Sequence, residues 1–166
     1  DNSSSFEISG FNFRIDTTTP TSSDKLNFVD TSSNLNQNIL SGIKVKIEVN
    51  PVSAGTTPSD YDGKVFKVID NPNSGTTYTS AQINGMYDFI AGANLPALTD
   101  LTLNTDNSYD VVLTGTTLPV ATLLTHTHAK TGNKTGSAKL LINASNSGNA
   151  TITAALNTLT NGQVSG

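Results

Sequence analysis

The chain of 166 residues carries a formal net charge of −4 and is long enough for one domain with a single hydrophobic core. Asn, Ser and Thr supply 62 residues and charged residues only 13%, while Val, Ile, Leu, Phe and Met number 42, so we expect a folded domain with an uncharged polar surface. One arginine and eight lysines exclude a strongly basic nucleic-acid binder, the lack of cysteine excludes disulfides and thiolate chemistry, and no apolar run approaches the ~18 residues that span a bilayer.

The first predicted element is a strand with five alternating apolar residues: Phe6, Ile8, Phe11, Phe13 and Ile15. The alternation slips by one residue next to Gly10, between the first two apolar residues and the last three. A β-bulge at Gly10 explains the slip and keeps all five side chains on one face. Alternatively, Phe6 and Ile8 serve a different face, or a different partner, from the rest.

Two strands are predicted in the next part of the chain. Residues 43–49 alternate strictly between β-branched apolar residues and Lys or Glu, which indicates a half-buried strand with one solvated face. Residues 64–69 form the second strand, bounded by turn residues on both sides. Four lysines form either a basic stripe across the two paired strands or a solvated outer face that resists edge pairing: Lys44, Lys46, Lys64 and Lys67.

One helix is predicted near residues 81–91. Ser80 suits the N-cap, and Gly92 suits the position after the helix ends. Gly85 inside this helix costs about 1 kcal/mol relative to alanine. The apolar residues recur at helical spacing: Ile83, Met86, Tyr87 and Ile90. Residues 118–125 are compatible with a second short helix and equally with a strand.

Two hairpins complete the predicted elements. Residues 101–103 and 109–113 flank a turn-rich segment and form the first hairpin. Residues 137–144 and 150–156 form the second, and its last strand directs Ile152, Ala154 and Leu156 toward the core. Seven to nine short strands with frequent turns predict an all-β fold, an antiparallel β-sandwich of jelly-roll or immunoglobulin-like topology, with one short helix inserted near 81–91. We expect a single domain over 1–166.

Candidate metal ligands are few. His126 and His128 project to one face if they lie on a strand, but no third ligand accompanies them, so we predict no metal site. Residues Asp106–Asp110 have oxygen ligands at the spacing that begins a calcium loop, without its later Gly and Glu, and Asp60–Asp62 is a similar fragment. Each fragment is either a weak calcium site or an ordinary turn.

Catalytic motifs are missing from the sequence. It contains no Gly-x-Ser-x-Gly nucleophile elbow, no phosphate-binding glycine loop and no dinucleotide-binding turn. Aromatic platforms for sugar binding are also not evident, because there is no Trp and the four tyrosines are scattered. We therefore predict that the chain is not an enzyme and needs no cofactor.

The sequence also bears on the setting of the protein. The chain begins at Asp1 rather than Met, which indicates removal of a leader peptide or a chosen boundary. Four sequons for N-glycosylation occur, at Asn2, Asn133, Asn143 and Asn149. Together with the low charge, these features favour an exported protein, secreted or held at the cell surface.

The opening residues 5–16, Ser-Phe-Glu-Ile-Ser-Gly-Phe-Asn-Phe-Arg-Ile-Asp, resemble the first strand of the TasA/camelysin-type biofilm-fibre subunits, in which an alternating Phe-x-x-Gly-x-Leu-x-Leu pattern follows the signal peptide. Residues 36–45 are similar to the Asn-rich turn that precedes a long strand in those subunits. The general composition also resembles archaeal thread and bundling-pilus subunits. The resemblance covers about 45 residues and implies assembly by donor-strand exchange.

Two hypotheses of function follow. The first is a structural subunit of an extracellular filament or pilus that polymerises with copies of itself, each subunit lending residues 1–9 as a donor strand to the next. The predicted donor-strand residues are the five alternating apolar residues of the N-terminal segment: Phe6, Ile8, Phe11, Phe13 and Ile15. The alternative is a monomeric cell-surface adhesion or ligand-binding β-sandwich.

Overall fold

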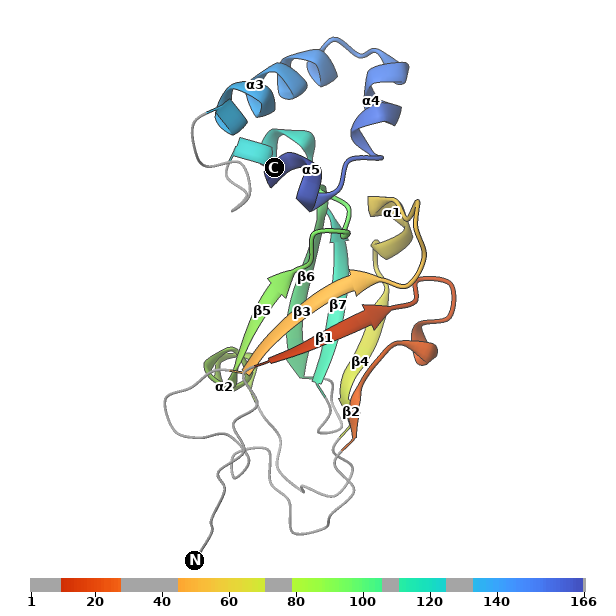
Figure 1. The fold of residues 1–166 in the computed structure, drawn as a ribbon, viewed down its shortest axis with the longest axis vertical. Coiled ribbons are helices and arrows are strands. Elements are labelled where there is room, and N and C mark those ends of the chain that lie inside the picture. Colours follow the sequence, from red (N-terminus) through yellow and green to blue (C-terminus); the bar gives the residue numbers. More distant parts are fainter. Residues whose placement is uncertain (1–9, 28–44, 71–78, 106–110, 125–132, 166) are drawn as a thin grey trace, which may run out of the picture.

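The structure is a computed structural model that describes residues 10–27, 45–70, 79–105, 111–124 and 133–165 (Figure 1). Its strands are β1 (Gly10–Ile15), β2 (Leu26–Asn27), β3 (Val45–Pro51), β4 (Val65–Asp70), β5 (Tyr87–Ala91), β6 (Thr99–Thr105) and β7 (Val111–Thr117). Its α-helices are α1 (Pro58–Tyr61), α2 (Ser80–Met86), α3 (Asn133–Asn146), α4 (Ala150–Leu156) and α5 (Asn161–Ser165). The 3-10 helices are η1 (Pro20–Ser22) and η2 (Val120–Leu124).

The strands form two sheets that pack face to face. One sheet has the order β1-β3-β5 and all its pairs are parallel; the other has the order β2-β4-β7-β6 and is mixed. From β1 to β5 the chain alternates between the sheets, running away from one end of the molecule in the first sheet and returning in the second (Figure 1). Strands of the same sheet therefore point the same way along this part of the chain, and only β7 reverses direction.

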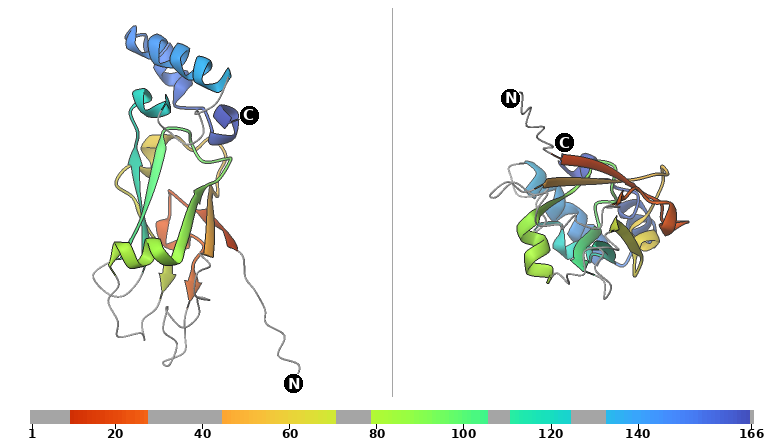
Figure 2. Two further views of the ribbon diagram at one scale, coloured as in Figure 1. Left: turned by 90° about the vertical axis from the view of Figure 1, so that its left-hand side faces the viewer. Right: turned by 90° about the horizontal axis from the view of Figure 1, so that it is seen from below.

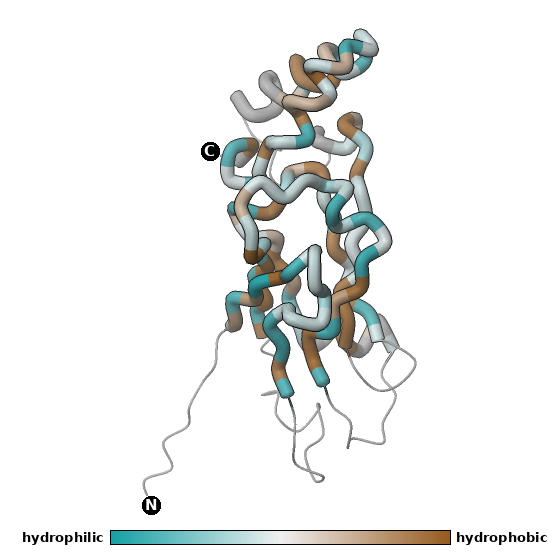
Figure 3. The backbone as a smooth tube through the Cα atoms, turned by 90° about the vertical axis from the view of Figure 1, so that its right-hand side faces the viewer, coloured by the Kyte–Doolittle hydropathy of each residue, from teal (hydrophilic) through white to brown (hydrophobic). Residues whose placement is uncertain are grey.

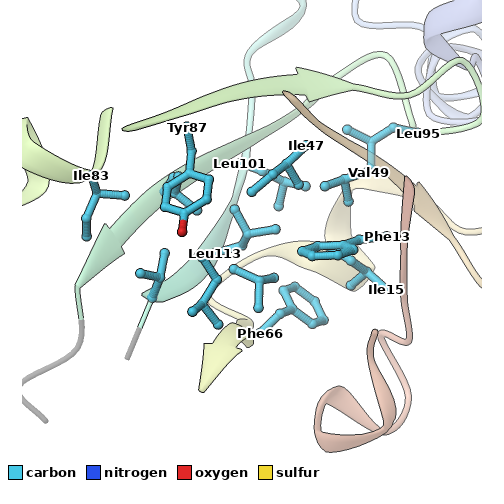
Figure 4. Close-up of a cluster of buried hydrophobic side chains, with 14 of the residues drawn as sticks. Phe13, Ile15, Ile47, Val49, Phe66, Ile83, Tyr87, Leu95, Leu101 and Leu113 are labelled. Atoms are coloured by element: carbon cyan, nitrogen blue, oxygen red, sulfur yellow. The ribbon is translucent and has the colours of Figure 1, made fainter. Parts of the chain in front are cut away.

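The main core lies between the two sheets (Figure 4). Alternate residues of the first sheet point into it, as the strict alternation of β3 predicts: Phe13, Ile15, Ile47, Val49 and Tyr87. The second sheet contributes buried residues of β4, β6 and β7 to the same core: Phe66, Val68, Leu101, Leu103, Val111 and Leu113. The register of β4 against β7 shifts between Lys67 and Ile69, and this irregularity lets two successive residues, Val68 and Ile69, both be buried.

Helix α1 covers one end of the core and is held by a close backbone approach. A Cβ atom built on Gly115 of β7 would collide with the carbonyl oxygen of Tyr61, so only glycine allows α1 to approach β7 this closely. The Gly63 N–H donates to the Gly115 carbonyl, and the Gly115 N–H donates to the Lys64 carbonyl. The side chain of Tyr61 enters the core beside Phe66, with ring centroids 6.1 Å apart.

Helices α3, α4 and α5 form a layer at the end of the sheets where β7 finishes (Figures 1 and 2). This layer has its own small apolar cluster, in which three of the described residues are buried: Ala97, Leu98 and Ala138. Asn161 fastens the layer to the sheets, because its backbone N–H donates to the Leu95 carbonyl at 2.8 Å and its side-chain amide donates to the Gly92 carbonyl at 3.3 Å. Figure 3 shows the apolar residues gathered along the strands and along one part of this layer.

The expected all-β antiparallel sandwich is wrong, because the described residues form a mixed α/β fold with parallel strand pairs and five α-helices. Strand alternation identifies which face of a strand is buried but says nothing about the neighbouring strand or its direction. Neither jelly-roll nor immunoglobulin-like topology accommodates the parallel β1-β3-β5 sheet.

The hairpin over 137–156 is also wrong, since α3 and α4 occupy this region. Asn149, which lies between the two predicted strands, is the N-cap of α4, and its Oδ1 accepts from the N–H groups of Thr151 and Ile152. Leu156 is buried as expected, but Ala154 is exposed because a helix does not place residues two apart on the same face.

The helix near 81–91 is only half correct. Helix α2 ends at Met86, and β5 begins at Tyr87 and pairs with β3. Gly92 therefore follows the end of a strand rather than of a helix, and a side chain there would collide with Asn50. In their described parts, the strands over 43–49 and 64–69 and the hairpin 101–113 are confirmed as β3, β4 and the β6–β7 pair. The 3-10 helix η2 lies within 118–125, where the sequence allows a helix or a strand. Among the described residues, no helix has the length and apolar character needed to cross a membrane.

Candidate functional site

The outer edges of the two sheets are the surfaces on which another strand could pair, and they differ in how they are covered. Within a strand, the N–H and C=O groups of one residue point to the same side, and successive residues point to opposite sides. The hydrogen bonds between strands therefore fix which backbone groups of each edge strand face outward. These outward groups decide where β-strand addition is feasible.

The edge of β1 is covered in its second half by the chain itself. The Arg14 N–H donates to Asp24 Oδ2 at 2.9 Å, and the Asp24 N–H donates to the Arg14 carbonyl at 2.9 Å. An ion pair of 3.3 Å between Arg14 Nε and the same carboxylate adds to this contact. Two residues after Arg14, the Asp16 N–H donates to Ser23 Oγ at 3.0 Å. A second strand cannot pair along this half of β1 without displacing residues 23–24.

The edge at β2 and β4 carries charged side chains. In the described part of the chain, strand β2 has two residues, which pair with Ile69 and Asp70. Lys25 Nζ and Lys67 Nζ lie 3.3 Å and 4.0 Å from the Asp70 carboxylate. Short edge strands and lysines are features that oppose pairing with another chain. Helix η1 also packs against β4, so little of this edge is exposed to a partner strand.

The edge of β6 is flanked by helix α2. Helix α2 packs against β6, and its Ile83 is fully buried in the main core. The Leu118 N–H donates to the Leu98 carbonyl, so the odd-numbered residues of β6 direct their backbone groups toward this flank. The helix therefore stands beside the outward groups of this strand.

The edge of β5 is the least covered of the four in the described part of the chain. The Gly92 N–H donates to the Val49 carbonyl at 2.8 Å, so Asp88 and Ile90 direct their backbone groups toward β3. Phe89 and Ala91 then direct their N–H and C=O groups away from the sheet, where no described strand pairs with them. Their side chains are half-buried against the main core. Ile90, on the opposite face of β5, is 36% exposed.

A polar network holds the far end of β5 in place. Asn50 of β3 donates from Nδ2 to Glu48 Oε1 at 3.2 Å and accepts at Oδ1 from the Asn94 N–H at 3.1 Å. Gly92 passes close beside the Asn50 side chain, where no Cβ would fit. This arrangement ties β3 to the turn after β5, so the open edge belongs to a strand that is fixed at both ends, by α2 and by Asn50.

The structure places the predicted donor-strand residues in two groups. Phe13 and Ile15 lie in β1 and are buried in the main core, and Phe11 is half-buried against it. Phe6 and Ile8 lie outside the described residues. Gly10 is the first residue of β1, paired with Lys46, and a Cβ there would approach the Lys46 carbonyl oxygen to 2.8 Å. The other half of the predicted bulge precedes the described part of the chain.

The glycosylation sequons also divide. Asn143 is exposed on α3, and Asn149 is exposed at the start of α4, where its Oδ1 caps the helix and its Nδ2, the atom that carries a glycan, is not used by the cap. Asn133 is the first residue of α3, and Asn2 lies outside the described residues.

The Asp60–Asp62 fragment places its two carboxylates on different partners. Asp60 closes a capping box at the start of α1, accepting from the Thr57 N–H and Oγ1, each at 2.8 Å. The backbone hydrogen bond from Thr57, followed by the side-chain one, holds the pKa of Asp60 below its usual range. Asp62 Oδ1 accepts from the Thr117 N–H at 2.9 Å. The carboxylates thus act as backbone caps, and no cluster of three metal-ligating side chains occurs within the described ranges.

The other candidates give less. His126, His128 and the Asp106–Asp110 fragment lie outside the described residues. The prediction of a basic stripe across two paired strands is wrong, because β3 and β4 belong to different sheets and do not pair. Lys46 lies in β3, whereas Lys67 lies in β4 and Lys64 directly precedes it. Lys44 lies outside the described residues.

The open edge of β5 is a feature that the sequence analysis missed. The sequence analysis assigns residues 87–91 to a helix because Ile83, Tyr87 and Ile90 fit helical spacing. The available signal was Gly85, which weakens a helix, followed by two aromatic residues two positions apart, Tyr87 and Phe89.

Comparison with protein families, with curated proteins and with solved structures finds no match for this chain.

Proposed function

We propose that the chain is a structural subunit of an extracellular filament or pilus, assembled when residues 1–9 of one copy complete the sheet of another. The observation that carries this proposal is the outward backbone of Phe89 and Ala91 on β5, an edge strand with neither lysine nor proline to oppose pairing. An alternating apolar segment stands just before Gly10, where β1 begins. One copy therefore carries both a candidate donor and a candidate acceptor.

The composition supports the same proposal. A surface rich in Asn, Ser and Thr has little charge to repel a neighbouring copy. A donated strand gains ladder hydrogen bonds and packs alternate side chains in the partner. Burial of Phe6 and Ile8 in this way contributes roughly 3–6 kcal/mol by surface transfer. Export to the cell surface, with glycans on the exposed sequons, belongs to the same proposal.

The test is deletion of residues 1–9. Because β1 begins at Gly10, this deletion leaves every described strand in place. We expect the full chain to form filaments in negative-stain micrographs and the truncated chain to remain a soluble monomer. A synthetic peptide of residues 1–9 should bind the truncated chain and raise its melting temperature.

A pair of matched variants separates apolar burial from charge. Phe6→Asp with Ile8→Asp should abolish assembly, whereas Ser5→Asp with Ser9→Asp adds the same charge at the alternate positions and should retain it. A full chain that stays monomeric at every concentration would exclude the filament and favour the monomeric adhesion domain. Equal loss of assembly in both variants would show that charge, and not burial, is responsible.

A further inference from the structure

The geometry points to the outer edge of β5 as the acceptor for residues 1–9 of a second copy. This inference rests on the proposed function and deepens it, because it excludes the other edges, requires the donor to come from a second copy and fixes the register of the donated strand. The other edges are covered in whole or in part by the described chain: the second half of β1 by residues 23–24, β4 by β2 and η1, and β6 by the flank of α2. Among the edges in the described part of the chain, β5 alone has uncovered outward backbone groups on residues whose own side chains are apolar and half-buried, Phe89 and Ala91.

The reach of the chain requires that the donor come from another copy. Strands of a sheet lie about 4.8 Å apart, so a strand added beside β5 stands three spacings, roughly 14 Å, from β1. Ile8 precedes Gly10 by two residues, which extend over at most about 7 Å. Ile8 of the same chain therefore cannot lie beside β5 while β1 keeps its place next to β3.

Charge selects the register of the donated strand. Glu7 alternates with Phe6 and Ile8, so its side chain faces outward when theirs face the core. The outward side chains of β5 are Asp88 and Ile90, and like charges directly opposite one another destabilise a sheet. Glu7 is thus placed opposite Ile90. Phe6 and Ile8 then extend the half-buried row formed by Phe89 and Ala91, whichever way the donor runs.

This pairing joins different surfaces of two copies. Each copy offers one donor segment and one acceptor edge, so the contact is heterologous and repeats without closing. The natural product is an open filament in which every β1-β3-β5 sheet gains a fourth strand. Both sheets of the molecule then contain four strands.

Engineered cysteines test the inference directly, because the chain contains none. In the full-length double variant Glu7→Cys/Ile90→Cys, oxidation should give a reducible ladder of dimers, trimers and higher species, since paired positions on neighbouring strands lie within disulfide reach. Each single variant should stop at dimers. In the double variant Glu7→Cys/Thr102→Cys the second thiol replaces the exposed side chain of Thr102 on β6, so this variant should give no ladder.

Proline substitution supplies an independent measurement. Ala91→Pro removes an N–H that faces away from β3, so the variant should fold but lose assembly. Asn12→Pro removes an outward N–H from β1, on the opposite edge, and should assemble like the unmodified chain. Filaments with unchanged assembly in Ala91→Pro, or a ladder through Thr102→Cys instead of Ile90→Cys, would overturn the β5 acceptor and leave the filament standing. A full chain without filaments would overturn both.

Discussion

Gly115 is the residue on which the packing of α1 depends most directly. It lies in β7 beneath the backbone of Tyr61, and the Cβ of any other residue would overlap the Tyr61 carbonyl oxygen. The same residue exchanges two backbone hydrogen bonds with residues 63 and 64. Backbone atoms on both sides of the contact leave little room for relaxation, unlike a contact with a flexible side chain.

We therefore expect Gly115→Ala to lower the free energy of unfolding by about 1–3 kcal/mol. Gly136→Ala is the matched control, because Gly136 lies in α3 with open space around its Cβ position, and alanine there should raise stability by about 0.5–1 kcal/mol. Urea denaturation measures both. Similar effects from the two substitutions would contradict the proposed collision.

Tyr61 brings a hydroxyl into the core. The side chain is fully buried, and its hydroxyl has no hydrogen-bond partner among the described residues. Burial, and then the negative charge of Asp60, raise the pKa of Tyr61 above its ordinary value. The neutral phenol is favoured in the folded state, so its contribution to stability is complete below the unfolded pKa of about 10 and is lost as pH rises beyond it.

Tyr61→Phe should retain stability at pH 7 or increase it by about 1 kcal/mol, because the hydroxyl is buried without a partner. The variant should also lose less stability than the unmodified chain between pH 9 and pH 11, since one buried phenol no longer ionises on unfolding. Urea denaturation across this range provides the measurement. Parallel alkaline losses in the two proteins would show that Tyr61 does not contribute.

Among the elements, α3, α4 and α5 depend on a smaller core than the sheets do. Their apolar cluster has three buried residues, and the remaining members are only partly buried, including Leu141, Ile142 and Val164. The attachment to the sheets runs through the hydrogen bonds of Asn161 and Gly162 with residues 92–95. Elements with fewer buried apolar contacts open at a lower free energy.

Hydrogen exchange should therefore proceed in two stages. The amides of α3 and α4 are expected to exchange before those of β3 and β7, which lie in the interior of the two sheets. Mass spectrometry of peptic fragments at several times distinguishes the two groups. Simultaneous exchange would mean that the helical layer and the sheets unfold as one cooperative unit.

For the whole molecule, the sheet topology connects fold and proposed assembly. The alternation of the chain between sheets leaves the three-stranded sheet with β1 and β5 as its two edges. Residues 23–24, which follow β1, cover part of its edge, whereas nothing in the described chain pairs with the outer side of β5. The proposed acceptor strand β5 and the strand β1 that follows the proposed donor segment are the opposite edges of this sheet, an arrangement suited to linear growth.

Local sequence patterns were enough to identify those strands whose buried face shows as an alternation of apolar and polar residues within the strand. The strict alternation of residues 43–49 fixed the buried face of β3, and the turn-rich segment between 103 and 109 fixed the β6–β7 hairpin, because neighbouring strands with a short connection pair antiparallel. The alternation of Phe11, Phe13 and Ile15 likewise identified the core face of β1. These features depend on side-chain period and short connections, which are local.

Only the tertiary structure decided which strands are neighbours, where α2 gives way to β5, and that residues 137–156 are helical. Parallel pairing joins segments distant in sequence, such as β1 and β3, and no local pattern encodes it. Residues 87–91 fit helix and strand alike, and pairing with β3 selects the strand. The Thr- and Asn-rich segments of α3 and α4 have weak intrinsic preference, so their helical form follows from packing of Ala138 and Leu156 and from the Asn149 cap.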